Sequence, residues 1–185
     1  MRGRGVISVS AGAILLLAAL WFFAEPQTLA ALAIAAVCHE LGHLAALRAM
    51  GCRAVGLRAD VSGAWIDYRG LPGRAGEILC AAAGPAAGLI CAFTAAKLGS
   101  NMQSSMLLTA AGISLALTAF NLLPALPLDG GRVLAALCGE KTAARLSFVV
   151  SLALLALGFV LLCRGEGVGL FAAGIWLVLA QADLP

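Results

Sequence analysis

Two histidines and a glutamate stand close together in residues 39–43, which read His-Glu-Leu-Gly-His. In a helix, His39 and His43 would lie one turn apart on the same face, with Glu40 directly after His39. Two imidazoles at this spacing can bind one zinc ion, while the glutamate reaches the water that the ion activates. The chain has only two histidines, and both belong to this pattern. We therefore predict a metal centre with His39 and His43 as ligands and Glu40 as the general base.

A structural explanation competes with this prediction. Two hydrogen-bonded histidines and a buried glutamate could serve only to hold membrane helices together. However, an ionisable group inside a bilayer costs roughly 2.5 kcal/mol or more unless it is compensated, so three neighbouring groups favour a functional reason. The metal centre is the better explanation.

A catalytic zinc ion normally has three protein ligands, so a third must come from elsewhere in the chain. Asp129 is the best candidate, because the other acidic side chains have ordinary explanations as hydrated groups in connections, at an interface or near a terminus. It follows Pro124 and Pro127, which end an apolar run, and precedes a glycine pair. Prolines break the helix and glycines let the backbone turn. A helix-ending turn would explain this segment alone, but an incomplete two-histidine site favours Asp129 as the third ligand.

The composition places these residues in a membrane protein. Of the 185 residues 62% are hydrophobic and only 11% charged, and the mean hydropathy is +1.02. A soluble chain needs more polar surface, whereas lipid accepts apolar side chains on the outside. Six apolar runs predict an all-α polytopic membrane protein with about six transmembrane helices, at residues 6–24, 28–50, 75–97, 105–124, 146–163 and 168–182. We interpret the first run as a retained helix and not as a cleaved signal peptide.

Two longer connections separate these runs. Residues 51–74 contain alternating stretches at 55–58 and 64–68 around a Ser62-Gly63 turn signal, which predicts a small β-hairpin at the membrane surface. Residues 125–145 carry Asp129 and a weak apolar segment at 133–138. The connection at 164–167 is so short that the helices on its two sides must form an antiparallel hairpin.

The basic residues indicate the orientation in the membrane. With six spans, ten of the twelve fall on one side, which the positive-inside rule assigns to the cytoplasm together with both termini and the active site. Only Lys97 and Arg164 fall on the other side. The ten are Arg2, Arg4, Arg48, Arg53, Arg58, Arg69, Arg74, Arg132, Lys141 and Arg145.

Other partners are less well supported by the sequence. The basic residues are scattered along connections, which argues against a nucleic-acid-binding patch. The six cysteines form no C-x-x-C pair, and most lie in apolar runs, so we expect neither disulfides nor a cysteine-ligated metal.

Two motifs resemble those of the site-2 protease family of intramembrane zinc metalloproteases. Residues 39–43 match H-E-x-x-H, and residues 121–131 match N-x-x-P-x-x-P-[LV]-D-G-G without a mismatch. The resemblance implies that Asp129 is the third ligand, that Glu40 is the general base and that Asn121 aids substrate or oxyanion binding. The Ala-Gly-Pro sequence at 83–85 is similar to a Gly-Pro element of the family, although close helix packing through Gly84 and Gly88 is the preferred explanation.

Within that family, the cytoplasm-facing six-span plan resembles the stage IV sporulation protein FB group, whose members process membrane-associated pro-sigma-K. Members of that group commonly carry a regulatory CBS domain. We expect here a single metalloprotease domain over residues 1–185, with a catalytic core at about 28–132 and no PDZ or CBS domain. Nucleotide sensing through such a domain is therefore not expected.

These observations predict an intramembrane zinc endopeptidase with one zinc ion. Its substrate would be a membrane-associated or transmembrane protein cleaved near the cytoplasmic face, such as a pro-sigma factor in sporulation. Its other partners would be the lipid bilayer and a membrane regulator, with no nucleic acid. A membrane metal transporter is the alternative, because intramembrane histidines and carboxylates also mark ion paths. A catalytically silent scaffold is a second one, which the intact Glu40 disfavours.

Overall fold

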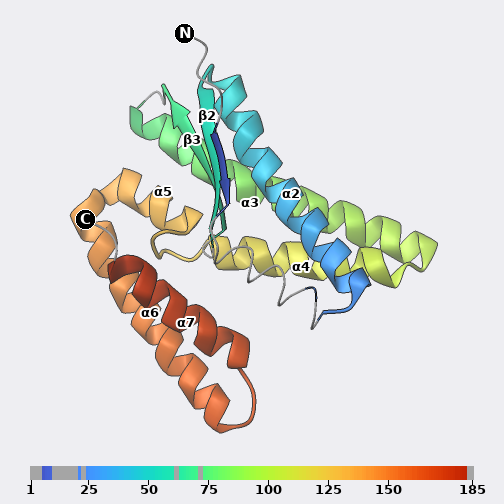
Figure 1. Ribbon diagram of the computed structural model, residues 1–185. Coiled ribbons are helices and arrows are strands. Elements are labelled where there is room, and N and C mark those ends of the chain that lie inside the picture. The colour runs from blue at the N-terminus through green and yellow to red at the C-terminus, as the bar shows by residue number, and fades with distance from the viewer. Residues whose placement is uncertain (1–5, 10–20, 22–23, 61–62, 71–72, 183–185) are drawn as a thin grey trace. The chain divides into compact units, whose positions relative to one another are not determined.

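The computed structural model describes residues 6–9, 21, 24–60, 63–70 and 73–182 (Figure 1). The chain divides into two compact units, residues 1–120 and 121–185. The elements in chain order are β1 (Val6–Val9), α2 (Pro26–Ala49), β2 (Arg53–Asp60), β3 (Gly63–Arg69), α3 (Gly73–Met102), α4 (Ser105–Asn121), α5 (Asp129–Cys138), α6 (Glu140–Cys163) and α7 (Val168–Ala182).

Three helices of the described part are long and apolar enough to cross a membrane, namely α2, α3 and α6. The apolar helices Ser105–Asn121 and Val168–Gln181 are shorter. Many large apolar side chains are exposed on these helices, among them Val37, Ile90 and Phe159. Lipid accommodates such a surface, whereas water does not. The chain therefore has the character of a membrane protein, but the predicted count of six spans is not supported.

The N-terminal prediction is wrong in its first residues. Val6–Val9 were expected to begin a membrane helix, but they form strand β1, which pairs in parallel with β2 from Val6 opposite Gly56 to Val9 opposite Ala59. A short apolar run fits a buried strand as well as a helix, so its composition could not decide. The rest of that predicted span lies almost entirely outside the described residues.

Strands β2 and β3 lie in the connection where the hairpin was expected. They pair antiparallel, from Arg53 opposite Arg69 to Asp60 opposite Gly63. Residues 61–62, in the predicted turn, lie outside the described residues. At the open end of the pair, the Cys52 thiol donates a hydrogen bond to the Gly70 carbonyl oxygen at 3.3 Å. The described part is thus predominantly helical, as predicted, with a small sheet of strand order β1-β2-β3.

Helix α2 has clear sequence signals at both ends. Pro26 occupies its first turn, where a missing N–H costs nothing. At the other end, Gly51 adopts a φ of 72°, and the Cys52 N–H donates to the Leu47 carbonyl at 2.9 Å. A glycine with positive φ and this backbone bond are typical of a helix C-terminus. The chain can therefore leave the helix at once and enter β2.

Small residues bring α2 and α3 close together. A Cβ atom on Gly42 would lie 2.6 Å from the Ala87 Cβ and 3.0 Å from the Ala83 carbonyl carbon, so only glycine fits there. Membrane helices commonly pack through small residues, because dispersion contacts replace the hydrophobic effect as the driving force. Helix α4 approaches α3 in the same way, where a Cβ on Gly99 would be 3.0 Å from the Leu107 Cβ.

In the second unit, α6 and α7 form a helical hairpin across residues 164–167. The backbone of Phe171 packs against Gly158, and Leu155 packs against Gly174. Because the partner numbers fall along one helix as they rise along the other, the two helices are antiparallel. This arrangement was predicted from the short connection and is confirmed.

Candidate functional site

His39 and His43 lie on the buried face of α2. Together with Ala31, Ala35 and Leu47 they form a stripe that recurs every four residues. Their exposed fractions are only 4% and 7%. A repeat of four residues keeps side chains on one side of a helix, so both imidazoles project from the same side of α2.

The backbone of α3 orients the His43 ring. His43 Nδ1 lies 2.8 Å from the carbonyl oxygen of Cys80. A carbonyl oxygen can only accept a hydrogen bond, so Nδ1 must carry the proton and donate it. In the neutral ring, Nε2 then bears the lone pair. Metal-binding histidines usually have such a partner on the other nitrogen, because it fixes the tautomer and the ring orientation.

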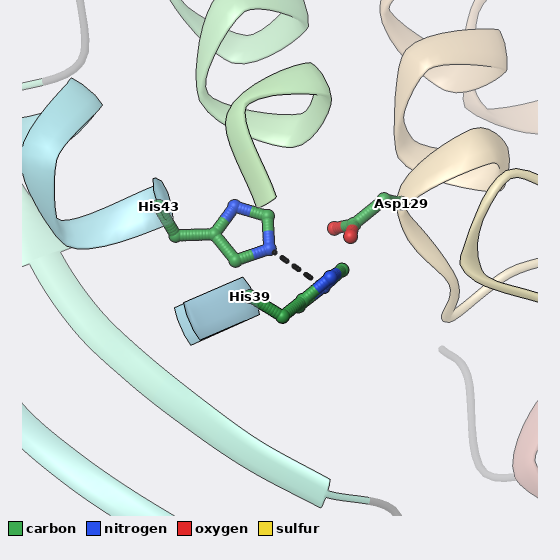
Figure 2. Close-up of side chains that lie close together, drawn as sticks. All are labelled: His39, His43 and Asp129. Carbon is green, nitrogen blue, oxygen red and sulfur yellow. Dashed lines mark hydrogen bonds between the residues drawn. The ribbon is translucent and has the colours of Figure 1, made fainter. Parts of the chain in front are cut away.

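The two Nε2 atoms of His39 and His43 face each other at 3.2 Å (Figure 2). Two nitrogens bound to one tetrahedral zinc ion, at about 2.0–2.1 Å each, would be roughly 3.3 Å apart. In the metal-free chain the same distance allows a hydrogen bond between the rings. The donor atoms and their spacing therefore fit a zinc ion without a rearrangement of α2.

Gly84 on α3 gives the His43 imidazole its space, and Gly88 gives space to the Thr118 side chain. A Cβ on Gly84 would overlap the His43 ring, at 2.5 Å from Cε1 and 2.8 Å from Cδ2. A Cβ on Gly88 would overlap the Thr118 hydroxyl and would lie 3.8 Å from His39 Nδ1. The sequence favoured close helix packing as the explanation of both glycines, and side chains of α2 and α4 do pack closely against them. The His43 ring packs against Gly84, whereas the tight neighbour of Gly88 is Thr118.

Glu40 is half-buried, in contrast to the histidines on either side of it. One residue further along a helix is a rotation of about 100°, so the carboxylate leaves α2 in a different direction from His39. A general base must reach the reacting water without occupying a ligand position. The place of Glu40 on α2 is compatible with that role.

Asp129 is the first residue of α5 and is buried, with 6% of its surface exposed. A carboxylate in the first turn interacts favourably with the positive end of the helix dipole. Arg132, one turn further on, places Nη1 3.4 Å from Asp129 Oδ1. Both interactions place positive charge beside the carboxylate, and the ionised carboxylate is the form that binds a metal.

The glycine pair after Asp129 serves close approach and not an unusual backbone conformation. Gly130 and Gly131 lie inside α5, and neither has a positive φ. A Cβ on Gly130 would lie 2.5 Å from the Leu123 carbonyl oxygen, and one on Gly131 would lie 2.6 Å from the Ala125 carbonyl oxygen. Our expectation that these glycines let the backbone turn was therefore wrong. They let α5 begin directly against the preceding loop.

Figure 2 shows His39, His43 and Asp129 together. Each residue offers one ligand atom, and these three atoms lie within 4.8 Å of one another. Two imidazole nitrogens and one carboxylate oxygen form a donor set that zinc accepts.

Residues 94–164 match Peptidase family M50. The matched segment is less than half of the chain. It contains Asn121 and Asp129 but not the histidines on α2. A search of curated proteins finds no significant match to the sequence.

Asn121 lies inside the M50 match, at the C-terminal end of α4. Its side chain is half-buried. The loop 122–128 separates it from Asp129 in the chain. Its expected role in substrate or oxyanion binding stays a prediction.

A solved structure shows the same fold. The site-2 protease from Methanocaldococcus jannaschii matches with a TM-score of 0.73 over 99% of this chain and 91% of that chain, at 20% sequence identity. At this identity the likeness establishes the fold alone. The M50 match makes residues 94–164 similar to a peptidase family, and the structural match shows a shared fold. They do not favour the alternative of a metal transporter.

Sequence reasoning missed two polar residues, of which the fold buries Thr118 and half-buries Gln181. Thr118 on α4 is 1% exposed, and its hydroxyl has no hydrogen-bond partner among the residues that the structure describes. Gln181 on α7 donates a hydrogen bond from Nε2 to the Ser151 hydroxyl at 2.6 Å. A signal was available for both, since Thr118 follows Ser114 by one helical turn and Gln181 interrupts an apolar helix.

Proposed function

We propose that this chain is an intramembrane zinc endopeptidase that cleaves a membrane-associated or transmembrane protein near the cytoplasmic face of the membrane. One observation carries the proposal. The Nε2 atoms of His39 and His43 are 3.2 Å apart on one helix, which suits two ligands of one zinc ion. The presence of Glu40 between them distinguishes a hydrolytic site from a purely structural one.

His39, His43 and Asp129 would hold the ion. The grouping of their ligand atoms within 4.8 Å supports this assignment. Three protein ligands leave one tetrahedral position open, as is usual in catalytic zinc sites. When bound, zinc makes a water molecule more acidic and polarises the carbonyl group that is attacked.

Glu40 would move the proton. It takes a proton from the attacking water and later gives it to the amine that leaves, so one carboxylate serves both steps. Asn121 would donate a hydrogen bond from its amide to the substrate carbonyl or to the oxyanion that develops there. Neither residue needs to bind the ion.

The substrate must present an extended backbone, because a helix hides its carbonyl groups in internal hydrogen bonds. In the described sheet, β3 pairs with β2 along one edge only. An extended substrate segment could therefore add to β3 as a further strand. Hydrogen bonds between backbones would hold it with little dependence on its sequence.

The cytoplasmic face is proposed from the distribution of charge. Under the six-span plan expected from the sequence, ten of the twelve basic residues would fall on the side assigned to the cytoplasm together with the termini. A membrane-associated pro-sigma factor, as in the stage IV sporulation protein FB group, is the first substrate to test. Control by a membrane regulator is part of the same proposal.

Co-expression with tagged candidate substrates tests the function. The full chain and its Glu40→Gln variant are each combined with a pro-sigma factor and with single-span membrane proteins, and the products are mapped by mass spectrometry. We expect a defined cleavage product with the wild-type chain and none with the variant. Equal cleavage in both samples would eliminate the protease, whereas metal uptake that survives the substitution would indicate a transporter.

A further inference from the structure

A buried polar cluster joins the loop before Asp129 to the α6–α7 hairpin. It contains Ser147 and Ser151 on α6, Gln181 on α7 and the backbone of Leu126. Both serines are fully buried. All of these groups belong to the second unit, residues 121–185. From Leu146 onward α6 is apolar except for its two serines, and α7 is apolar except for Gln181, so these polar groups require a reason.

Both hydrogen-bonding groups of Leu126 are held by this cluster. Its N–H donates to the Ser147 hydroxyl at 2.9 Å, and its carbonyl accepts from Gln181 Nε2 at 3.1 Å. Gln181 Nε2 also donates to the Ser151 hydroxyl at 2.6 Å, and that hydroxyl donates to the Ser147 carbonyl at 2.8 Å. Because the Leu126 carbonyl can only accept, it fixes the orientation of the Gln181 amide.

Gln181 is the only strongly polar side chain in α7, whose sequence is VGLFAAGIWLVLAQA. An amide in an apolar helix is retained only where it finds partners or has a function. A leucine would satisfy the apolar surroundings equally well. The glutamine is therefore explained by its hydrogen bond to Leu126 in the loop and not by the packing of α7 itself.

The Leu126 peptide supports the start of α5. A Cβ on Gly131 would meet the backbone at Leu126, so the first turn of α5 rests directly on this peptide. The Leu128 N–H, next to Asp129, donates to the Ala125 carbonyl at 2.9 Å. A shift of Leu126 must therefore be transmitted to Asp129, which lies only three residues further along.

We infer that Gln181 and Ser147 are positioning residues, which hold the Asp129 carboxylate where it can bind zinc. This inference rests on the proposed function. Neither residue touches the ion or the substrate. They act through the Leu126 peptide, so the C-terminal helix would contribute to the affinity of Asp129 for the metal.

Zinc affinity of the full chain, measured by chelator competition in nanodiscs, tests the inference. Gln181→Leu should weaken zinc binding by about 10–100-fold, the range found when partners of metal ligands are removed. Gln27→Leu is the matched control, because it removes an equally short bond of 2.6 Å, from Gln27 Nε2 to the Ser105 hydroxyl. The control should bind zinc as the wild-type chain does.

A double-mutant cycle with Asp129→Asn separates positioning from general damage. If Gln181 acts through Asp129, Gln181→Leu should cause little further loss of zinc affinity once Asp129 is replaced. An equal loss in both backgrounds would overturn the inference and leave the proposed function intact. If Asp129→Asn does not weaken zinc binding at all, the proposed metal centre fails, and the inference fails with it.

Hydrogen exchange in the zinc-free chain provides a readout that needs no metal. Gln181→Leu and Ser147→Ala should each accelerate exchange in residues 122–128, while Gln27→Leu should not. Ser147→Ala removes only the bond to the Leu126 N–H, so it tests the inference if the Gln181→Leu variant does not fold. Unchanged exchange together with unchanged zinc affinity in Ser147→Ala would overturn the inference.

Discussion

Replacing Gly84 by alanine tests the packing of His43 against α3. The added methyl group would lie 2.5 Å from His43 Cε1 and 2.8 Å from Cδ2. Non-bonded carbons prefer a separation of about 3.5–4.0 Å, so the ring must move by roughly 1 Å. The neighbouring helices cannot easily separate, because Gly42 also packs tightly between them.

A displacement of that size exceeds what a zinc site accepts. Metal–ligand distances must be correct to within about 0.2 Å. The movement also strains the hydrogen bond of 2.8 Å between His43 Nδ1 and the Cys80 carbonyl. We expect zinc affinity to fall by at least about 100-fold, which corresponds to about 2.7 kcal/mol.

Chelator competition measures this loss, and Gly112→Ala on α4 is the control. It adds the same methyl group to a helix, but nothing lies within 4 Å of the new atom. Both substitutions gain up to about 1 kcal/mol of helix propensity, so propensity cannot explain a difference between them. A Gly84→Ala variant that binds zinc within about threefold of the wild-type chain would refute the reasoning.

Three further predictions concern the proposed metal centre. Glu40→Gln should lower the turnover rate by about 10²–10⁴-fold, because the residue moves a proton. The zinc content, measured by atomic absorption, should stay unchanged, because the residue does not bind the ion. A parallel loss of zinc would argue against that role. Asp129→Asn should weaken zinc binding, since the amide has no negative charge, and equal affinity for both chains would remove Asp129 from the ligand set. Removal of zinc with a chelator should abolish cleavage, which added zinc restores, and activity that persists without metal would exclude a metalloprotease.

The sequence by itself determined the local part of the site. The spacing of His39 and His43 required only that the segment be helical, and α2 provides this. Apolar runs likewise predicted α2, α3 and α7 to within a few residues, because burial in lipid needs a continuous apolar stretch. Local spacing and local composition carry this information, so no knowledge of the fold was needed.

The secondary structure of short apolar segments could not be predicted from local composition. The sequence Val-Ile-Ser-Val at 6–9 suits either a helix or a strand, and its pairing with β2 decides for the strand. That pairing joins segments about fifty residues apart. A pattern inside one segment cannot contain such information.

Only the tertiary structure decided what supports the histidines and the Asp129 loop. The Cys80 carbonyl beside His43, the space that Gly84 leaves for the ring, and the bond from Gln181 to Leu126 all join segments far apart in the chain. Backbone carbonyls leave no trace in a sequence, because every residue has one. Close packing depends on which helices meet and at what height, and this is settled by the fold as a whole.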